Sequence, residues 1–239
     1  MSDGVHERAA PVSDARAEIL GRIRAALADV EQDDARVEIP REYGRGGSLD
    51  RGALVELLVE RIRDYAAEAE PVAVADVGRG VRDACDRLGI GRLLVAPGVP
   101  RTWWPGGAGE GDDRSLAGDD ERPRAEEDDG RPAAALDAVD GVLTGCALAI
   151  AETGTVVLDG RPPCGRRALT LVPDRHICVV SAEQIVERVP EAIGALRERV
   201  LAEGAPVTFV SGSSATSDIE LERVEGVHGP RRLLVLVAG

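Results

Sequence analysis

Lysine is absent from this chain of 239 residues, so all 29 of its basic residues are arginine. The absence excludes a Schiff-base enzyme and a phosphate-binding loop lysine, because both need an ε-amine. Aromatic residues are scarce too, with two Tyr, two Trp and one Phe. We therefore expect neither a base-stacking platform nor a membrane aromatic belt. The net charge of −14 repels phosphate backbones, so nucleic acid is not an expected partner.

Long apolar runs and clustered cysteines are also missing. No run approaches the roughly 20 residues that cross a bilayer, and the N-terminus lacks a signal-peptide pattern. We therefore expect a soluble, cytoplasmic protein without a membrane span. The four cysteines, Cys85, Cys146, Cys164 and Cys178, contain no C-x-x-C pair. Ordinary thiols are favoured over a zinc or iron–sulfur site, so we expect no metal and no cofactor in this chain.

The chain divides by composition into three parts. Residues 1–12 are predicted to be a flexible tail. Residues 13–70 are predicted to be an N-terminal helical segment that packs on the main domain, with Ile19, Ile23 and Leu27 on one helical face. Residues 71–239 are predicted to form the main α/β domain.

Apolar runs alternate with helical patterns through the main domain. Residues 71–77, 92–97, 145–151, 155–160, 176–181, 206–210 and 232–238 are predicted strands, and residues 182–203 are a predicted helix. Strands joined by crossover helices are typical of parallel sheets. The sequence therefore predicts an α/β fold with a largely parallel sheet of about six or seven strands and helices on both faces.

An acidic segment at residues 106–132 interrupts this pattern. It holds ten acidic residues and four arginines, a net charge of −6, with glycine and proline throughout. Such a composition buries little apolar surface, so a disordered surface insertion is expected. An acidic docking segment is the functional alternative.

Three polar segments are candidates for chemistry. The first joins two predicted strands and contains Glu152, Thr153, Gly154 and Thr155. A carboxylate at a sheet end can act as a nucleophile or a general base, so Glu152 is a candidate catalytic residue and its neighbours are candidate ligand-binding residues. A simple hairpin with a solvated Glu is the structural alternative.

The second candidate segment follows a predicted strand directly and contains Gly212, Ser214, Thr216 and Asp218. Its hydroxyl and backbone N–H groups suit a small anion such as a carboxylate or phosphate and do not require lysine. A serine-rich turn that caps a following helix explains the same residues equally well.

Histidine and arginine mark the third candidate segment. His228 lies in a rigid Gly-Pro context as a candidate catalytic residue, and Arg231 is a candidate anion clamp. A surface turn is the alternative. His176, at the start of a predicted strand, is more typical of a hydrogen-bonded structural histidine than of a ligand.

Taken together, residues 151–158, 169–180 and 211–231, with the opening helix, resemble the LUD domain of the lactate-utilisation protein C family. The resemblance covers most of residues 13–239. It implies a fold similar to the NagB/RpiA/CoA-transferase superfamily. It also implies a role in bacterial oxidation of L-lactate to pyruvate, alongside two iron–sulfur proteins that would hold the redox centres.

The last motif departs from the family pattern at two positions. Ser213 stands where the family usually has Pro, and Ser217 stands where it has Ala, whereas the neighbouring hydroxyl and acidic residues match. The substitution of Pro makes the loop less rigid and keeps its anion-binding groups.

Three hypotheses about function follow. The first is a non-redox component of a lactate-oxidising iron–sulfur complex that binds a small carboxylate or phosphorylated ligand, or a partner. The second is a transferase of acyl or CoA groups, because Glu152-Thr153-Gly154 is similar to the Glu-Asn-Gly turn that carries the nucleophile in CoA transferases. The third is an assembly or regulatory module with a vestigial pocket.

Overall fold

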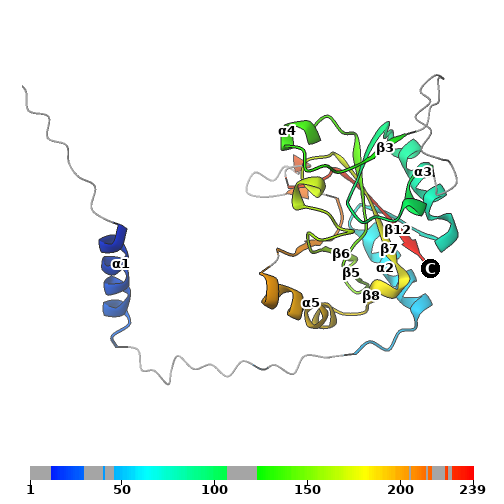
Figure 1. Cartoon of the computed structure of the whole chain (residues 1–239). Helices are drawn as coiled ribbons and strands as arrows, with labels where there is room; N and C mark the ends of the chain where they lie inside the picture. Colours follow the sequence, from blue (N-terminus) through cyan, green and yellow to red (C-terminus); the bar gives the residue numbers. More distant parts are fainter. Residues whose placement is uncertain are drawn as a thin grey trace, which may run out of the picture. The chain divides into compact units, whose positions relative to one another are not determined.

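Two compact units, residues 1–43 and residues 44–239, make up the chain in this computed structural model (Figure 1). The structure describes residues 12–29, 40, 46–106, 123–204, 206–213, 215–216, 224–225 and 228–239. Helix α1 (Val12–Ala26) belongs to the first unit, and its apolar residues Ile19 and Ile23 are exposed. That this helix packs on the main domain stays a prediction. Among the described residues, no helix is both long and apolar enough for a membrane span.

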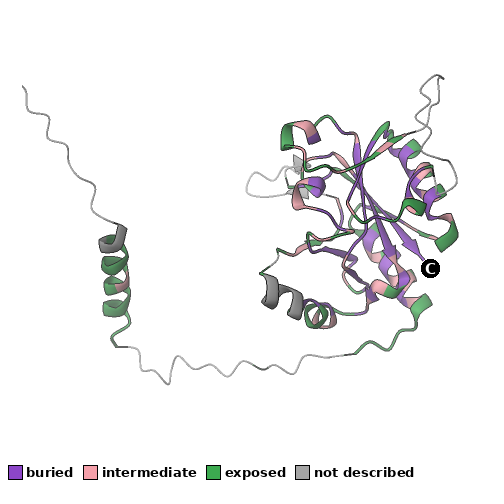
Figure 2. Cartoon of the chain, in the orientation of Figure 1, coloured by how far each residue is buried: buried purple, intermediate pink, exposed green. Residues whose placement is uncertain are grey.

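A six-stranded parallel sheet forms the centre of the second unit and confirms the predicted α/β class. In spatial order its strands are β1 (Glu68–Val72), β12 (Arg232–Ala238), β7 (Arg175–Ser181), β4 (Gly141–Thr144), β2 (Arg92–Val95) and β3 (Arg124–Glu127). Each pair of neighbours is parallel. The interiors of the central strands β7 and β12 are buried (Figure 2), which explains why they are nearly continuous apolar runs in the sequence.

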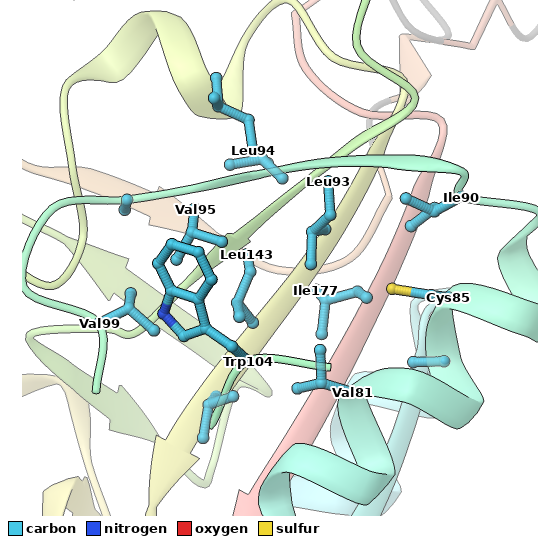
Figure 3. Packing of buried hydrophobic residues seen from close by; sticks show 14 of the residues in the cluster. Val81, Cys85, Ile90, Leu93, Leu94, Val95, Val99, Trp104, Leu143 and Ile177 are labelled. Atoms are coloured by element: carbon cyan, nitrogen blue, oxygen red, sulfur yellow. The ribbon is translucent and has the colours of Figure 1, made fainter. Parts of the chain in front are cut away.

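One face of the sheet packs against helix α3 (Val77–Leu88). Alternate side chains of β7, including Ile177, point to this face and join a buried cluster with Val81 and Cys85 of α3 (Figure 3). The short element η1 (Val74–Asp76) directly precedes α3, while η2 (Arg101–Trp103) and α4 (Ala133–Leu136) contribute Trp103 and Leu136 to the packing of this cluster. Trp104, directly after η2, packs in the same cluster.

The other face is covered by helix α2 (Arg51–Asp64) and by a second, smaller sheet. The strands of that sheet, in spatial order, are β8 (Ile185–Val186), β5 (Leu148–Ile150), β6 (Thr155–Leu158) and β9 (Thr208–Val210). Helix α5 (Val189–Glu203) packs on it through Ala192 and Leu196. Helices therefore cover both faces of the main sheet, as predicted. On one of these faces, the smaller sheet lies beside the helix.

Several predicted elements differ from the observed ones. The predicted strand at 71–77 ends at Val72, after which the chain becomes helical. The predicted helix at 182–203 starts only at Val189, after the short elements η4 (Ala182–Gln184) and β8. Strand β3 lies inside the segment 106–132 that was expected to be disordered, where it pairs with β2. Residues 107–122 of that segment are outside the described residues.

Helix α2 is anchored at its start by two adjacent side chains. The Asp50 carboxylate accepts a hydrogen bond from the Ala53 N–H at 2.9 Å, which satisfies an otherwise unpaired donor of the first turn. The Arg51 guanidinium donates to the carbonyls of Ala182 and Ile185 at 2.7 and 3.0 Å. These contacts join the helix to the strand-rich layer beside it.

A buried polar pair connects two strands of the main sheet. The Thr144 hydroxyl, at the end of β4, lies 2.8 Å from Nε2 of His176, near the start of β7, and the two residues are 0% and 1% exposed. Burial, together with the smaller effect of the nearby Arg167 charge, lowers the pKa of His176 to about 4. The imidazole is therefore neutral at physiological pH.

Acidification should destabilise the protein through His176. The unfolded histidine, with a pKa near 6.5, binds a proton that the folded one refuses until about pH 4. The unfolded state thus binds more protons in this window, so stability falls as the pH falls through it. Between pH 7 and pH 4 we expect a loss of about 3 kcal/mol in the free energy of unfolding from this group.

Urea denaturation at several pH values measures this dependence. A His176→Gln variant should show a flatter slope, whereas a His228→Gln variant, which keeps the buried pair, should retain the wild-type slope. Identical slopes in wild type and His176→Gln would contradict the assignment.

Candidate functional site

A small cleft of about 240 Å³ lies beside the amino ends of β7 and β12. These strands are neighbours in register, with Arg175 opposite Arg232, so the segments that precede them meet at the same end of the sheet. The cleft is lined by Arg167, Thr170, His176, Thr208, Phe209, Val210, Ser211, Gly212, Ser213, His228, Gly229 and Pro230. Parts of the second and third predicted segments therefore share one cavity.

Arg167 supplies the permanent positive charge among these lining residues. It begins the short helix η3 (Arg167–Thr170), and its Nη1 donates to the carbonyl and hydroxyl oxygens of Thr170 at 2.7 and 3.0 Å. Its Nη2 donates to the His228 carbonyl at 3.0 Å. Within the described part of the chain these partners are neutral oxygens, so they orient the guanidinium and leave its charge unbalanced. Two of its five N–H donors have no partner among the described residues.

The preceding residue, Arg166, has a different task. Its guanidinium forms a two-pronged ion pair with Asp128, at 2.7 and 2.9 Å, and also donates to the Arg131 carbonyl at 2.7 Å. The hydrogen bonds from Arg166 hold the pKa of the Asp128 carboxyl below its usual range. This pairing ties the segment before η3 to the loop after β3, and thereby holds the backbone from which Arg167 extends.

Electrostatically, the cleft contrasts with the acidic chain around it. Its described lining contains one arginine and two histidines and no carboxylate. His176 forms part of the wall and stays neutral, for the reasons given above. Hydroxyl groups of Thr170, Ser211 and Ser213 add neutral hydrogen-bonding capacity. Such a set suits one small anion carrying a single charge.

The first predicted segment meets the second through a chain of hydroxyl groups. Thr153 Oγ1 lies 2.7 Å from Thr155 Oγ1, which in turn lies 2.6 Å from Ser211 Oγ. Because Ser211 lines the cleft, the turn between β5 and β6 reaches it indirectly. Thr153 and Thr155 themselves are not among the described lining residues.

Two of the predicted ligand-binding glycines have a packing role. Gly154 has φ +59°, and a Cβ there would lie 2.6 Å from the Arg61 carbonyl carbon of α2. Gly212 has φ +103°, and a Cβ there would lie 2.5 Å from the Tyr65 carbonyl oxygen at the end of the same helix. Both positions favour glycine, because a side chain would be strained and would collide with backbone.

The remaining predicted site residues are placed as follows. Glu152 is exposed on the turn between β5 and β6 and does not line the described cleft. His228 lines the cleft from an exposed position. Arg231 forms a 2.9 Å ion pair with Asp174 and is likewise outside the described lining. The cation that the structure brings to the cleft is thus Arg167.

Three further predicted site residues are Ser214, Thr216 and Asp218. Ser214 and Asp218 lie outside the described residues. Thr216 belongs to the short strand β10 (Ala215–Thr216), which pairs with β11 (Val224–Glu225), and only its backbone is described.

All four cysteines are free thiols in buried positions. Cys146, Cys164 and Cys178 belong to one apolar cluster between the main sheet and its α2 side, although they are far apart in the sequence. Burial raises the pKa of Cys85 and of Cys164 to about 12, so these thiols stay protonated at neutral pH. Within the described residues, no group of three or more His, Cys, Asp and Glu side chains is arranged to hold a metal ion.

Arg167 and Thr170 were missed by the sequence analysis, and His176 was assigned a structural role. The sequence signal that could have indicated Arg167 was its position, together with His176, near the start of a predicted strand. It was weak because two adjacent arginines look alike in sequence, and only the structure shows that Arg166 is paired with a carboxylate.

Comparisons with known proteins agree with this architecture. The family model for the LUD domain matches residues 110–238. A Deinococcus radiodurans protein named Lactate utilization protein C is 42% identical over 228 residues, which are 95% of this chain and 97% of that protein. A Bacillus subtilis protein of the same name is 36% identical over 92 residues, covering 37% of this chain and 38% of the relative.

A solved structure provides a further comparison. The crystal structure of a DUF162 family protein from Deinococcus radiodurans has a TM-score of 0.62 and 36% sequence identity, and the match covers 80% of this chain and 99% of that one. The family model matches more than half of the chain, and the Deinococcus radiodurans protein named Lactate utilization protein C is similar to nearly the whole chain. The chain therefore belongs to the LUD domain family.

Proposed function

We propose that this protein is a component of a lactate-utilisation system, in which it serves the oxidation of L-lactate to pyruvate without carrying a redox centre. The observation that carries the proposal is the 42% identity with a protein named Lactate utilization protein C along 95% of the chain. Two iron–sulfur proteins are the proposed partners, and the cytoplasm is the proposed location.

The chemistry of the cleft supports a ligand-binding role within that system. Arg167 has N–H donors that no described residue engages, and a charge that its described partners leave unbalanced. Arginine favours planar carboxylates, because two of its N–H groups can point at the two oxygens together. A volume of about 240 Å³ suits a ligand of only a few heavy atoms. We propose that a small carboxylate binds there.

The positions of the thiols support the proposed division of labour with redox partners. An iron–sulfur cluster needs thiolate ligands, usually four cysteines close together. Here Cys85 belongs to the cluster on the α3 side of the sheet, whereas the other three cysteines belong to the cluster on the α2 side. The proposal therefore assigns electron transfer to the partners.

Reconstitution tests the proposed function. Lactate-to-acceptor electron transfer is measured with the two iron–sulfur partners, with and without this chain. We expect turnover to fall to background when the chain is left out, because the proposed complex is then incomplete. Unchanged turnover would contradict the proposal.

Substitution of Arg167 tests the anion site separately. An Arg167→Gln variant should weaken L-lactate binding about 10- to 100-fold, because a charge-assisted hydrogen bond is lost. Isothermal titration calorimetry gives the dissociation constants. An Arg231→Gln variant is the matched control and should bind within about twofold of wild type, because Arg231 is already paired with Asp174. The opposite result would place the anion on the loop that contains Arg231.

Glu152 distinguishes this proposal from the transferase alternative. A nucleophilic Glu152 would attack an acyl-CoA to give an acyl anhydride and free CoA, and the CoA thiolate would then form a thioester with Glu152 and release the free carboxylate. We expect no adduct in intact-mass measurements, because Glu152 is exposed and outside the described cleft lining. An adduct that disappears in a Glu152→Gln variant would favour the transferase. Normal growth on lactate with both Arg167→Gln and Glu152→Gln would favour an assembly module with a vestigial pocket.

A further inference from the structure

We propose that the outer edge of strand β9, which faces away from β6, and the guanidinium of Arg167 together bind the C-terminal end of a partner polypeptide in an extended conformation. The inference goes beyond the proposed function and rests on the same anion site. The terminal carboxylate of the partner would occupy the position of the small carboxylate at Arg167. The partner and the small carboxylate would therefore exclude one another.

The register of β9 shows which of its main-chain groups face outward. Among the described residues β9 has one neighbouring strand, β6, and the antiparallel register places Val157 opposite Phe209. The Val157 carbonyl accepts a hydrogen bond from the Ala147 N–H at 2.8 Å, so it points toward β5 and away from β9. Val157 and Phe209 are therefore a pair without mutual hydrogen bonds, and the N–H and C=O groups of Phe209 point to the outer edge.

This outer edge borders the cleft that contains Arg167. The cleft of about 240 Å³ is lined by every residue from Thr208 to Ser213, which is the whole of β9 and the residues that follow it. Since β6 occupies the other edge of the strand, the outer edge is the one that can border open space. A ligand in the cleft thus lies close to Arg167 and to main-chain groups that no described residue engages.

The combination of a strand edge and a cation favours a peptide end over other ligands. An edge strand presents N–H and C=O groups that an added extended chain satisfies. An internal peptide segment would leave the Arg167 charge without a partner, and a small acid would leave the edge of β9 without one. The end of a polypeptide brings main-chain amides for the edge and a carboxylate for the guanidinium.

The charges of the cleft restrict the last side chains of the partner. Arg167 is the one arginine of the described lining, which contains no carboxylate. His176 is neutral, because its pKa is lowered to about 4. A basic side chain beside the terminal carboxylate would be repelled by Arg167, and an acidic one would bring a second negative charge that this cation does not balance. We therefore expect the last residues of the partner to be uncharged.

Phe209 provides an apolar contact for the added strand. Its side chain is 46% exposed although it is aromatic. Directly opposite residues share one face of a sheet, so Phe209 lies on the face of Val157, which is fully buried in the cluster beside α5. A β-branched or aromatic residue on the added strand would cover Phe209 on that face, and we expect such a residue near the end of the partner.

The partner is a different polypeptide, and a second folded copy of this chain does not qualify. The C-terminal residues here form β12, which pairs with β1 on one side and with β7 on the other. The Gly239 N–H also donates to the Val72 carbonyl at 3.1 Å. Release of this end would open the centre of the main sheet and expose the buried side chains of β12.

A synthetic array of extended peptides tests the docking of a chain end. Each peptide, varied over uncharged residues at its last positions, is made with a free C-terminal carboxylate and, as matched control, with a C-terminal amide. Fluorescence anisotropy with the full chain should show about tenfold tighter binding of the best carboxylate peptides than of their amides. Arg167→Gln should remove this difference, whereas Arg231→Gln should keep it, because Arg231 is paired with Asp174.

Pairing with the strand edge is tested separately on the best carboxylate peptide. Each amide near its C-terminus is replaced in turn by an ester, which removes one N–H donor and leaves the protein unchanged. At least one ester should weaken binding about fivefold, because a hydrogen bond to β9 is lost. On the protein, Phe209→Pro removes the outward N–H, which edge strands tolerate, and should bind the peptide more weakly than Phe209→Val, which keeps it.

The possible failures are distinguishable. If no carboxylate peptide binds more tightly than its amide, while L-lactate binding depends on Arg167, the docking role is overturned and the small-carboxylate site remains. If every ester binds as tightly as the parent peptide, addition to the strand edge is wrong. Where L-lactate binds, an excess of it should displace the peptide, and simultaneous binding would contradict the shared site. If neither ligand depends on Arg167, the anion site itself is wrong.

Discussion

The parallel pairing of β7 with β12 is the constraint on which the rest of the structure depends. Seven residue pairs are in register, from Arg175 opposite Arg232 to Ser181 opposite Ala238. Because both strands are buried on both faces, a slip of one residue would exchange the apolar sets that face α3 and α2. The same register brings the segments before the two strands together, which is where the cleft forms.

A chain without lysine and with a net charge of −14 nevertheless maintains a cationic cleft. It does so by giving two adjacent arginines different environments. Arg166 meets a nearly buried carboxylate, whereas Arg167 meets neutral oxygens of Thr170 and His228. The local charge of the cleft is thus determined by which carboxylates are kept away from it, and overall composition says little about it.

The sequence predicted the fold class and most strand positions, because these depend on local apolar runs and on family motifs. It did not predict that residues 145–151 and 206–210 contribute to a separate sheet, since both read as buried strands wherever they pair. Strand β3 was missed because its exposed, acidic residues resemble those of a solvated loop. The role of Arg167 depends on contacts with residues 3 and 61 positions away, which local patterns do not reveal.

Two loops that are far apart in the sequence both pack against the last turn of α2. Gly154 rests against the backbone of Arg61 and Ile62, and Gly212 rests against Tyr65, within four residues of each other on that helix. The spacing between the β5–β6 turn and the loop after β9 is therefore set by less than two turns of helix. Impaired function in a variant of either glycine would consequently report a displaced loop, and it would say nothing about which atoms touch the ligand.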